Sequence, residues 1–557
     1  MPFVGEIFSQ LKAASGVTVL QEIRDGQVTG VTGAELLAMV RKARTFLASR
    51  KLNKGDRCGL LAANSIRWMA VDLAAMAEGL IVVPLYSRQA PAELVSIIKD
   101  SSPALICCGD PMLGDGIRQH WPEASRAEAP PQFLFDEIFD AVVAPEGVEL
   151  DRPQLVDADP VTIIYTSGTS GEAKGVILTS ANVGFMLGCT AARLDSLMEG
   201  RSGQDRIFHY LPFSFCASWI AMLTFLLRGS LVTLNTDLTK IPNDMPAVAP
   251  YYFLNVPQLL ERMRRGVDDQ IAKKGGLAQA IYPRAKAAWL RQKERRPQAG
   301  DAFWLWLAKA ALFPTIRKKM VGENLRALIS GSAPLTPETQ DYFSMLGIPV
   351  LQVYGLTETT GICTMDDPHQ FTPGRVGPAI PGIEMRISEN EEIVVRGPNV
   401  FPGYWNRPQQ TADALRDGWF HTGDQGEMDS SGNWRIVGRI KNLIVLGSGH
   451  KIAPETVEEE IAVHLPAAQQ VVVLGDGRGY LSAIVTGNVT PEQAQAALDA
   501  VNSQLPHYKQ VRAFVLRSEP FSIDNGMLTA NGKLKRDLIS VRLKNEIEQL
   551  YQVKQAV

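Results

Sequence analysis

The stretch "TIIYTSGTSGEAKGVILTS", Thr162 to Ser180, places a loop of hydroxyl-bearing residues and glycines between two apolar runs. The runs "IIY" and "VIL" contain β-branched, aromatic and aliphatic residues typical of strands, and the residues between them favour a tight turn. Glycine lets backbone N–H groups approach an anion closely, hydroxyls donate hydrogen bonds, and Lys174 adds a positive charge. We therefore predict a strand, a loop that cradles phosphate, and a second strand.

Helical and strand patterns alternate on both sides of this loop. The helical spacing of residues 33–50 is followed by the strand-like run "DRCGLLAAN", and the same succession returns from about Phe208. Such alternation predicts an α/β protein with layered subdomains and a largely parallel sheet. Past Ile387 the strands become short and are broken by Gly, Asp and Asn, which predicts a β-rich subdomain.

The chain length predicts more than one domain, because 557 residues exceed what a single hydrophobic core serves. The pattern changes near Arg439, after which the sequence is typical of a compact α+β unit. We expect a large N-terminal domain, residues 1–439, and a small C-terminal domain, residues 440–557.

Composition narrows the class of protein. A net charge of -3 and a hydrophobic content of 45% fit a soluble enzyme and give no overall positive field, so nucleic acid is not an expected partner. The cysteines form no C-x-x-C pair, which favours a reducing cytoplasm. The N-terminus lacks the order of a signal peptide, and the longest uncharged apolar run, residues 215–227, is too short to cross a bilayer.

The loop is not the common nucleotide loop, because Lys174 precedes Gly175 and a strand follows. Instead "YTSGTSGEAKGV" resembles the phosphate loop of the adenylate-forming superfamily of acyl-CoA synthetases, peptide-synthetase adenylation domains and luciferases. Further motifs of that superfamily follow in the expected order: "SGSAPL" from Ser330, "VYGLTETTG" from Val353, "GWFHTGD" from Gly418, "GRIKNLIVLGSGHKIAPETVE" from Gly438 and "TANGKLKR" from Thr529. The resemblance spans nearly the whole chain.

The resemblance implies a two-step reaction. A carboxylate attacks the α-phosphorus of ATP and expels pyrophosphate, and the resulting acyl adenylate then reacts with the thiol of coenzyme A. Catalysis at phosphorus depends on positioning and on charge neutralisation. The residues that would hold the β- and γ-phosphates are Thr166, Ser167, Gly168, Thr169, Ser170, Gly171 and Lys174.

The other nucleotide contacts are implied in the same way. Glu358 matches the glutamate linked to Mg²⁺, a hard ion that prefers oxygen ligands, and Thr357 matches a phosphate-contacting threonine. The residues matching the adenine pocket are Tyr354, Gly331, Ser332 and Ala333. Asp424 matches the acceptor for the ribose hydroxyls, and Arg439 is its companion.

The C-terminal motifs imply a domain that rotates between the two steps. Lys533 matches the lysine brought to the α-phosphate and the acyl carboxylate; Lys535 is a competitor, but Lys533 follows Gly532 as the catalytic lysine does. Lys441 occupies the hinge position. Gly449 matches the backbone that lines the tunnel for the coenzyme A thiol, where a side chain would obstruct entry.

The identity of the acid is left partly open. Residues 267–289 resemble the helical insertion of long-chain fatty acyl-CoA synthetases, which favours a long-chain acid. Two departures concern the acyl pocket: Phe215 and Ser180 stand where long-chain members usually have histidine. An unusual acid, transfer to a carrier protein or another acceptor instead of coenzyme A, and a nucleotide-binding protein without activity remain as alternatives.

The insertion also combines basic and aromatic residues between Arg284 and Lys319. One interpretation is peripheral contact with the inner face of a membrane, where basic residues attract anionic lipids and aromatic rings favour the interface. The other is that the rings cover the protein's own core and the charges are merely solvated. The remaining expected partners are small molecules: the acid, ATP and coenzyme A.

Overall fold

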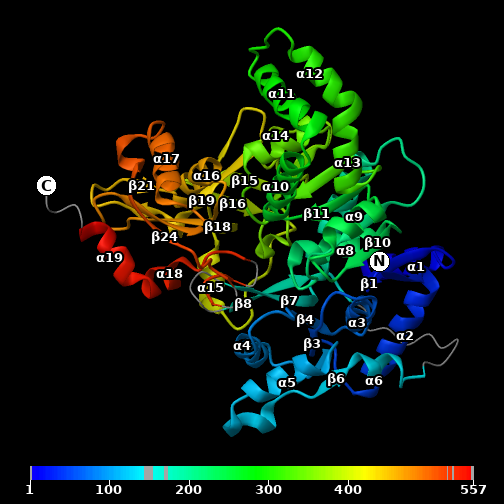
Figure 1. Cartoon of the computed structure of the whole chain (residues 1–557). Helices are drawn as coiled ribbons and strands as arrows, with labels where there is room; N and C mark the ends of the chain where they lie inside the picture. Colours follow the sequence, from blue (N-terminus) through cyan, green and yellow to red (C-terminus); the bar gives the residue numbers. More distant parts are fainter. Residues whose placement is uncertain (1–2, 144–154, 168–172, 523–524, 530–531, 553–557) are drawn as a thin grey trace. The chain divides into compact units, whose positions relative to one another are not determined.

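The computed structural model describes residues 3–143, 155–167, 173–522, 525–529 and 532–552 (Figure 1). Its contacts divide the chain into two compact units. The first unit comprises residues 1–166, 175–384 and 396–413, and the second comprises residues 167–174, 385–395 and 414–557. Each unit therefore contains segments that are far apart along the chain.

One sheet of the first unit carries the phosphate-loop strands at its edge. Its strands run in the order β6-β5-β3-β4-β7-β8, and the pairs of β3 with β4 and β5, of β4 with β7 and of β5 with β6 are parallel. Their bounds are β3 Arg57–Leu61, β4 Ile81–Leu85, β5 Leu105–Cys108, β6 Gln132–Leu134, β7 Pro160–Ser167 and β8 Ala173–Thr179. Every residue of β4 is buried, as expected of a parallel strand covered on both faces. The accompanying helices are α2 Gly33–Ser49, α3 Ile66–Ala77, α4 Pro91–Ser101, α5 Pro111–His120, the 3₁₀ turn η1 Glu123–Glu128 and α6 Phe135–Phe139.

A second sheet in the first unit runs in the order β14-β13-β12-β11-β9-β10-β1-β2. Its interior pairs are parallel, whereas β2 and β14 pair antiparallel at the two edges. The bounds are β1 Thr18–Arg24, β2 Gln27–Thr32, β9 Arg206–His209, β10 Leu231–Asn235, β11 Tyr252–Asn255, β12 Ala327–Ser330, β13 Val350–Tyr354 and β14 Thr364–Met365. Helix α1 Phe3–Ala13 precedes β1, and the helices between the strands include α7 Ser180–Leu197, α8 Cys216–Leu227, α9 Ile241–Val248 and α14 Pro337–Met345.

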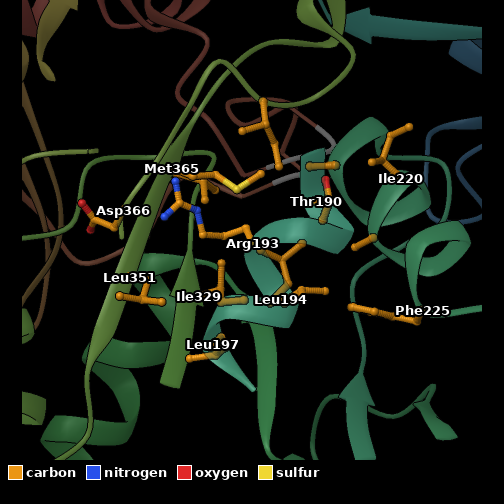
Figure 2. Close-up of a pocket in the computed structure, with 15 residues that line it drawn as sticks. Thr190, Arg193, Leu194, Leu197, Ile220, Phe225, Ile329, Leu351, Met365 and Asp366 are labelled. Carbon is orange, nitrogen blue, oxygen red and sulfur yellow. The ribbon is translucent and has the colours of Figure 1, made fainter. Parts of the chain in front are cut away.

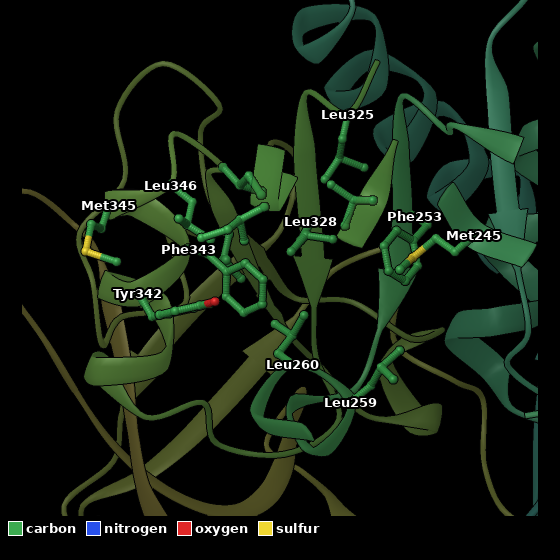
Figure 3. Packing of buried hydrophobic residues seen from close by; sticks show 14 of the residues in the cluster. Met245, Phe253, Leu259, Leu260, Leu325, Leu328, Tyr342, Phe343, Met345 and Leu346 are labelled. Carbon is green, nitrogen blue, oxygen red and sulfur yellow. The ribbon is translucent and has the colours of Figure 1, made fainter. Parts of the chain in front are cut away.

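The segment between β11 and β12 is helical, as the sequence predicts. It forms α10 Pro257–Lys274, α11 Gly276–Lys293, α12 Asp301–Leu307, a π-helical turn η2 Ala308–Leu312 and α13 Phe313–Val321. Figure 3 shows part of the core beneath it, where Phe253 and Leu328 on the sheet lie near Leu259 and Leu260 of α10 and Phe343 of α14. The insertion therefore contributes to the core of the first unit.

A third sheet contains short strands of the subdomain that the sequence predicts to be β-rich. Its order is β15-β16-β18-β17, with β19 also pairing with β18. The bounds are β15 Glu384–Ile387, β16 Glu392–Arg396, β17 Leu415–Arg416, β18 Trp419–Met428 and β19 Trp434–Arg439, with helix α15 Pro408–Ala414 before β17. The sequence boundary at residues 439 and 440 remains a prediction.

The rest of the second unit is the α+β element expected from the sequence. Two small sheets, β20-β21 and β22-β23-β24, pack with short helices around apolar clusters. The strands are β20 Ile444–Val445, β21 Lys451–Ile452, β22 Ala468–Leu474, β23 Leu481–Gly487 and β24 Val511–Arg517. The helices of this unit are η4 Ile440–Asn442, α16 Pro454–His464, α17 Pro491–Asn502, η5 His507–Lys509, α18 Arg536–Arg542 and α19 Lys544–Gln552. The short helix η3 Thr357–Thr359 belongs to the first unit. The predicted mixed α/β class is confirmed.

Candidate active site and acyl pocket

The phosphate loop connects two neighbouring strands, as predicted. Thr166 and Ser167 end β7, and Lys174 lies at the start of β8. Gly168, Thr169, Ser170 and Gly171 lie outside the described residues. Their proposed role in phosphate binding stays a prediction.

Gly175, directly after Lys174, sits where no side chain fits. A Cβ there would lie 2.7 Å from Cγ2 of Ile163 and 3.2 Å from Cβ of Trp405. The backbone N–H of Trp405 donates to the carbonyl of Gly175 over 2.7 Å, and Val176 bridges to Tyr404. The segment around Tyr404 is therefore packed tightly along the strand that follows the phosphate loop.

The same segment holds Glu358. The hydroxyl of Tyr404 donates to Oε1 of Glu358 over 2.8 Å, and the backbone N–H of Phe401 donates to the Glu358 carbonyl over 2.9 Å. The Tyr404 ring packs edge-on against Phe401 with centroids 4.8 Å apart. Both the backbone and the carboxylate of Glu358 are thus positioned by residues 401–404.

The turn that carries Thr357 and Glu358 is closed by backbone contacts. A Cβ on Gly355 would lie 2.5 Å from the carbonyl oxygen of Gly361, so only glycine allows this approach. Burial raises the pKa of the Cys216 thiol at the start of α8, and the charge of Glu358 raises it further. Tyr354, just before the turn, ends β13.

The small-residue motif follows β12. A Cβ on Gly331 would lie 2.7 Å from Cγ2 of Val353, which explains glycine at this strand end. Ser332 has a φ of 73°, a conformation uncommon for a residue with a side chain, and Ser332 and Ala333 are exposed. The motif therefore brings backbone and small side chains to the end of β12, next to the strand that leads to Tyr354.

In the second unit, Asp424 and Arg439 form an ion pair across β18 and β19. They are direct partners in the strand register, and Nε of Arg439 lies 2.7 Å from Oδ1 of Asp424. Asp424 is buried, and its backbone N–H donates to the hydroxyl of Thr422 over 3.0 Å. The structure thus brings together the two residues that the sequence paired.

Lys441 follows this pair within η4. Its pKa is lowered, first by partial desolvation and then by the charges of Arg439 and Lys174. A cation whose charged form is disfavoured by neighbouring cations is suited to meet an anion. Gly449 has a φ of 84°, and a Cβ there would meet open space, so its backbone angle rather than crowding explains the glycine.

Lys533 lies on a turn before α18, with its side chain exposed. Its carbonyl accepts from the Thr529 N–H over 2.8 Å, and its N–H donates to the Thr529 hydroxyl over 3.1 Å. Lys535 instead caps α18 and is half-buried. The geometry is compatible with the choice of Lys533, the more exposed of the two.

The structure also contains an apolar pocket whose lining the sequence did not predict (Figure 2). It lies between α7, α8 and the strands β11 to β13. Its lining is Thr190, Arg193, Leu194, Leu197, Ala217, Ile220, Ala221, Phe225, Leu254, Ile329, Leu351, Val353, Ile362, Met365 and Asp366. Apolar residues on helices and strands look the same in sequence whether they fill a core or line a pocket, so no sequence signal distinguishes them.

The pocket borders the nucleotide motifs at one place. Val353 directly precedes Tyr354, and Ile362 directly follows the turn that carries Glu358. Ala217 also lines the pocket, and its Cα would lie 3.3 Å from a Cβ on Gly361. An acid bound in the pocket would therefore have one end beside these motifs.

Comparison with known proteins identifies the family. A sequence profile described as AMP-binding enzyme matches residues 10–405, and one described as AMP-binding enzyme C-terminal domain matches residues 441–555. The chain belongs to the AMP-binding enzyme family. The resemblance inferred from the motifs, to the adenylate-forming superfamily, is confirmed.

Similar proteins cover almost the whole chain. The chain is 28% identical to long-chain-fatty-acid–CoA ligase FadD15 of Mycobacterium bovis, over 98% of this chain and 96% of the relative. It is 26% identical to long-chain-fatty-acid–CoA ligase ACSBG2 of Rattus norvegicus, over 94% of this chain and 88% of the relative. Among solved structures, ATP-bound MatB from Rhodopseudomonas palustris superposes with a TM-score of 0.74 at 23% identity, covering 98% of this chain and 99% of that one. The structural likeness establishes the fold.

Two features bear on metal and membrane. Within the described residues, no group of three or more His, Cys, Asp or Glu side chains is placed to hold a metal ion. Across the same ranges, none of the helices combines the length and apolar character needed to cross a bilayer.

Proposed function

We propose that this protein activates a long-chain fatty acid with ATP, forming acyl-AMP and pyrophosphate, and transfers the acyl group to coenzyme A. The observation that carries the proposal is the near full-length similarity to proteins named long-chain-fatty-acid–CoA ligases. The apolar pocket supports it, because its lining is mostly aliphatic and suits a hydrocarbon chain. The family establishes adenylate chemistry; the long chain is the proposed refinement.

The residues fit a magnesium ion shared with ATP. Mg²⁺ is usually held by one or two carboxylates together with substrate phosphates, rather than by a cage of protein ligands. Glu358 supplies one carboxylate, whose Oε1 is oriented by Tyr404. When bound, the ion would neutralise phosphate charge.

The remaining proposed roles follow the motifs. Thr166, Ser167 and Lys174, with the loop residues 168–171, would hold the phosphates, and Tyr354 with residues 331–333 would contact adenine. Asp424 would accept from the ribose hydroxyls, with its carboxylate oriented by the ion pair with Arg439. Lys533 would neutralise charge on the acyl carboxylate and α-phosphate as they react.

The deciding experiment measures pyrophosphate release across saturated acids of rising chain length, with and without coenzyme A, and identifies the thioester by mass. We expect release to rise with chain length and the thioester to appear only with coenzyme A. Highest activity on a short or aromatic acid would contradict the long-chain proposal. Release of pyrophosphate without any thioester would point to a different acceptor.

Two substitutions in α8 test whether the pocket holds the chain. Ala221→Phe fills the pocket and should move the preference toward shorter acids, whereas Ile220→Ala enlarges it and should move the preference the other way. A general loss of stability would not move the chain-length preference of the two variants in opposite directions. An unchanged length profile in both variants would place the acyl chain elsewhere.

A further inference from the structure

The hairpin of α11 and α12 presents aromatic side chains to solvent. Phe303 and Trp306, both on α12, are 55% and 64% exposed. On the opposite face of the same helix, Asp301 and Leu305 are buried. Figure 1 shows α11 and α12 side by side at the top of the view, in green. The exposed rings are therefore not required by the core beneath them.

The exposed face continues past α12. Ala302, Lys309 and Ala310 are also exposed, at positions that share the helical face of Phe303 and Trp306. The rings are grouped, since the centroids of Phe303 and Trp304 lie 5.3 Å apart and those of Phe303 and Trp306 lie 6.4 Å apart. The guanidinium of Arg284, on α11, lies 5.0 Å from the Trp304 ring centre. We call Arg284, Arg295, Arg296, Phe303, Trp306 and Lys309 the hairpin patch.

The charge of this region differs from that of the chain. Residues 276–321 contain ten Lys or Arg and two Asp or Glu, whereas the whole chain has a net charge of -3. Two of these cations form ion pairs within the protein: Arg291 donates to Asp301, and Lys293 pairs with Asp341 of α14. Arg295, Arg296 and Lys309 are exposed. The segment that carries the exposed rings is therefore basic, and Arg284 is the cation placed directly against its aromatic group.

We propose that the hairpin patch docks the protein on an anionic lipid bilayer. Aromatic rings on an exposed helical face insert at the level of the headgroups, and basic residues beside them attract anionic lipid. A polyanion such as nucleic acid would use the cations but gives no reason for exposed aromatic rings on a helical face. Docking there would place the enzyme where long-chain acids are dissolved, although the binding itself does not depend on the proposed reaction.

The test is flotation of the full-length protein with phosphatidylglycerol vesicles or phosphatidylcholine vesicles. We expect the protein to float with phosphatidylglycerol at low salt, to be largely released at high salt, and to remain at the bottom with phosphatidylcholine. Replacing Arg295, Arg296 and Lys309 with Glu should weaken partitioning by about a hundredfold or more, because each basic residue near the surface contributes about a fivefold gain.

The aromatic side chains have a matched control. The double variant Phe303→Ser with Trp306→Ser should lose roughly tenfold or more in partitioning, because it removes the inserted apolar surface. The control changes two apolar residues exposed elsewhere, Met112→Ser with Val541→Ser, and should bind vesicles as the unchanged protein does. Melting temperature and adenylation activity on dissolved acid verify that each variant is folded.

Three outcomes would overturn the proposal. Absence of flotation with phosphatidylglycerol at low salt would exclude docking altogether. Equal losses in the aromatic double variant and its control would show that the hairpin patch is not the contact. A change of oligomeric state in the aromatic variant, with vesicle binding retained, would make the patch an interface between protein chains. Because flotation needs neither ATP nor turnover, these outcomes are independent of the proposed reaction.

Discussion

Around Glu358 hydrogen bonds position both the carboxylate and the backbone, and around Lys533 hydrogen bonds position the backbone of an exposed side chain. Glu358 receives a hydrogen bond on its carboxylate from Tyr404 and another on its carbonyl from Phe401. At Lys533 the backbone N–H and carbonyl each form a hydrogen bond with Thr529, and the side chain is exposed. A carboxylate that holds a metal benefits from being positioned in advance, while a lysine that must reach a reacting group benefits from a fixed base and a long side chain.

The turn that carries Lys533 is followed by an ion pair between Arg536 and Glu458. Arg536 donates from Nη1 to Oε1 of Glu458 over 2.8 Å and from Nη2 to Oε2 over 2.5 Å, which joins the start of α18 to α16. Burial raises the pKa of Glu458, and Arg536 opposes that rise. We call the Arg536–Glu458 ion pair the anchor. Substitutions of Arg536, Lys533, Tyr404 and Lys441 test these differences in turn.

The largest effect is expected from Arg536→Leu. It leaves Glu458 buried without its partner, which should lower the free energy of unfolding of the second unit by about 3–5 kcal/mol. Denaturant unfolding, followed by hydrogen exchange in residues 454–464, measures the loss. The control, Arg435→Leu, removes an exposed ion pair with Glu427 and should cost less than about 1 kcal/mol. Equal losses in the two variants would mean that the anchor does not hold the turn.

Lys533→Ala should slow formation of acyl adenylate by roughly a hundredfold or more, because a preorganised charge is removed from a developing anion. Thiolysis of supplied acyl adenylate should change much less. The half-reactions are measured separately by pyrophosphate release and by thioester formation. Lys535→Ala is the matched control, and a larger defect there would transfer the role to Lys535.

Tyr404→Phe should raise the magnesium concentration needed for half-maximal adenylation by about tenfold, because the hydrogen bond that orients the Glu358 carboxylate is lost. Calorimetric binding of ATP at a series of magnesium concentrations gives a readout separate from turnover. Tyr282→Phe removes a comparable hydroxyl, bonded to Asp268 over 2.6 Å, and should leave the magnesium requirement unchanged. A drop in turnover with an unchanged magnesium requirement would assign Tyr404 to packing alone.

The smallest effect is expected at the hinge. Lys441→Pro should slow the thioester step a few-fold more than adenylation, because proline fixes φ at about -65° and restricts rotation there. The measurement is the ratio of the two half-reaction rates in the variant and the unchanged protein. If that ratio is the same in both, the pivot lies elsewhere in the chain.

Motifs built on glycine could be predicted from the sequence, and long-range contacts could not. Gly175, Gly331 and Gly355 stand where a Cβ would collide with a neighbouring segment, so the local motif already carries the constraint. The strands on both sides of the phosphate loop are predicted by the β-branched and aromatic residues of the two apolar runs. Asp424 and Arg439 were paired through the resemblance, and the β18–β19 register places them opposite each other.

Tyr404 was missed because its contact depends on the fold. Its partner Glu358 lies 46 residues away along the chain, and nothing in the local sequence specifies that separation. The lining of the pocket was missed because it repeats the apolar spacing of an ordinary core. The assignment of residues 385–395 to the second unit likewise depends on the pairing of β16 with β18, which alternating hydrophobicity does not reveal.

The packing of the insertion has an evolutionary consequence. Tyr282 and Ala285 of α11 are buried in the same cluster as Leu260 and Tyr342, which lie on elements outside the hairpin. Deleting the hairpin in one step would expose that cluster to water and leave cavities that the neighbouring side chains do not fill. A lineage could therefore gain or lose this segment only together with changes in the surrounding core, so its presence should be inherited as a unit with the residues beneath it.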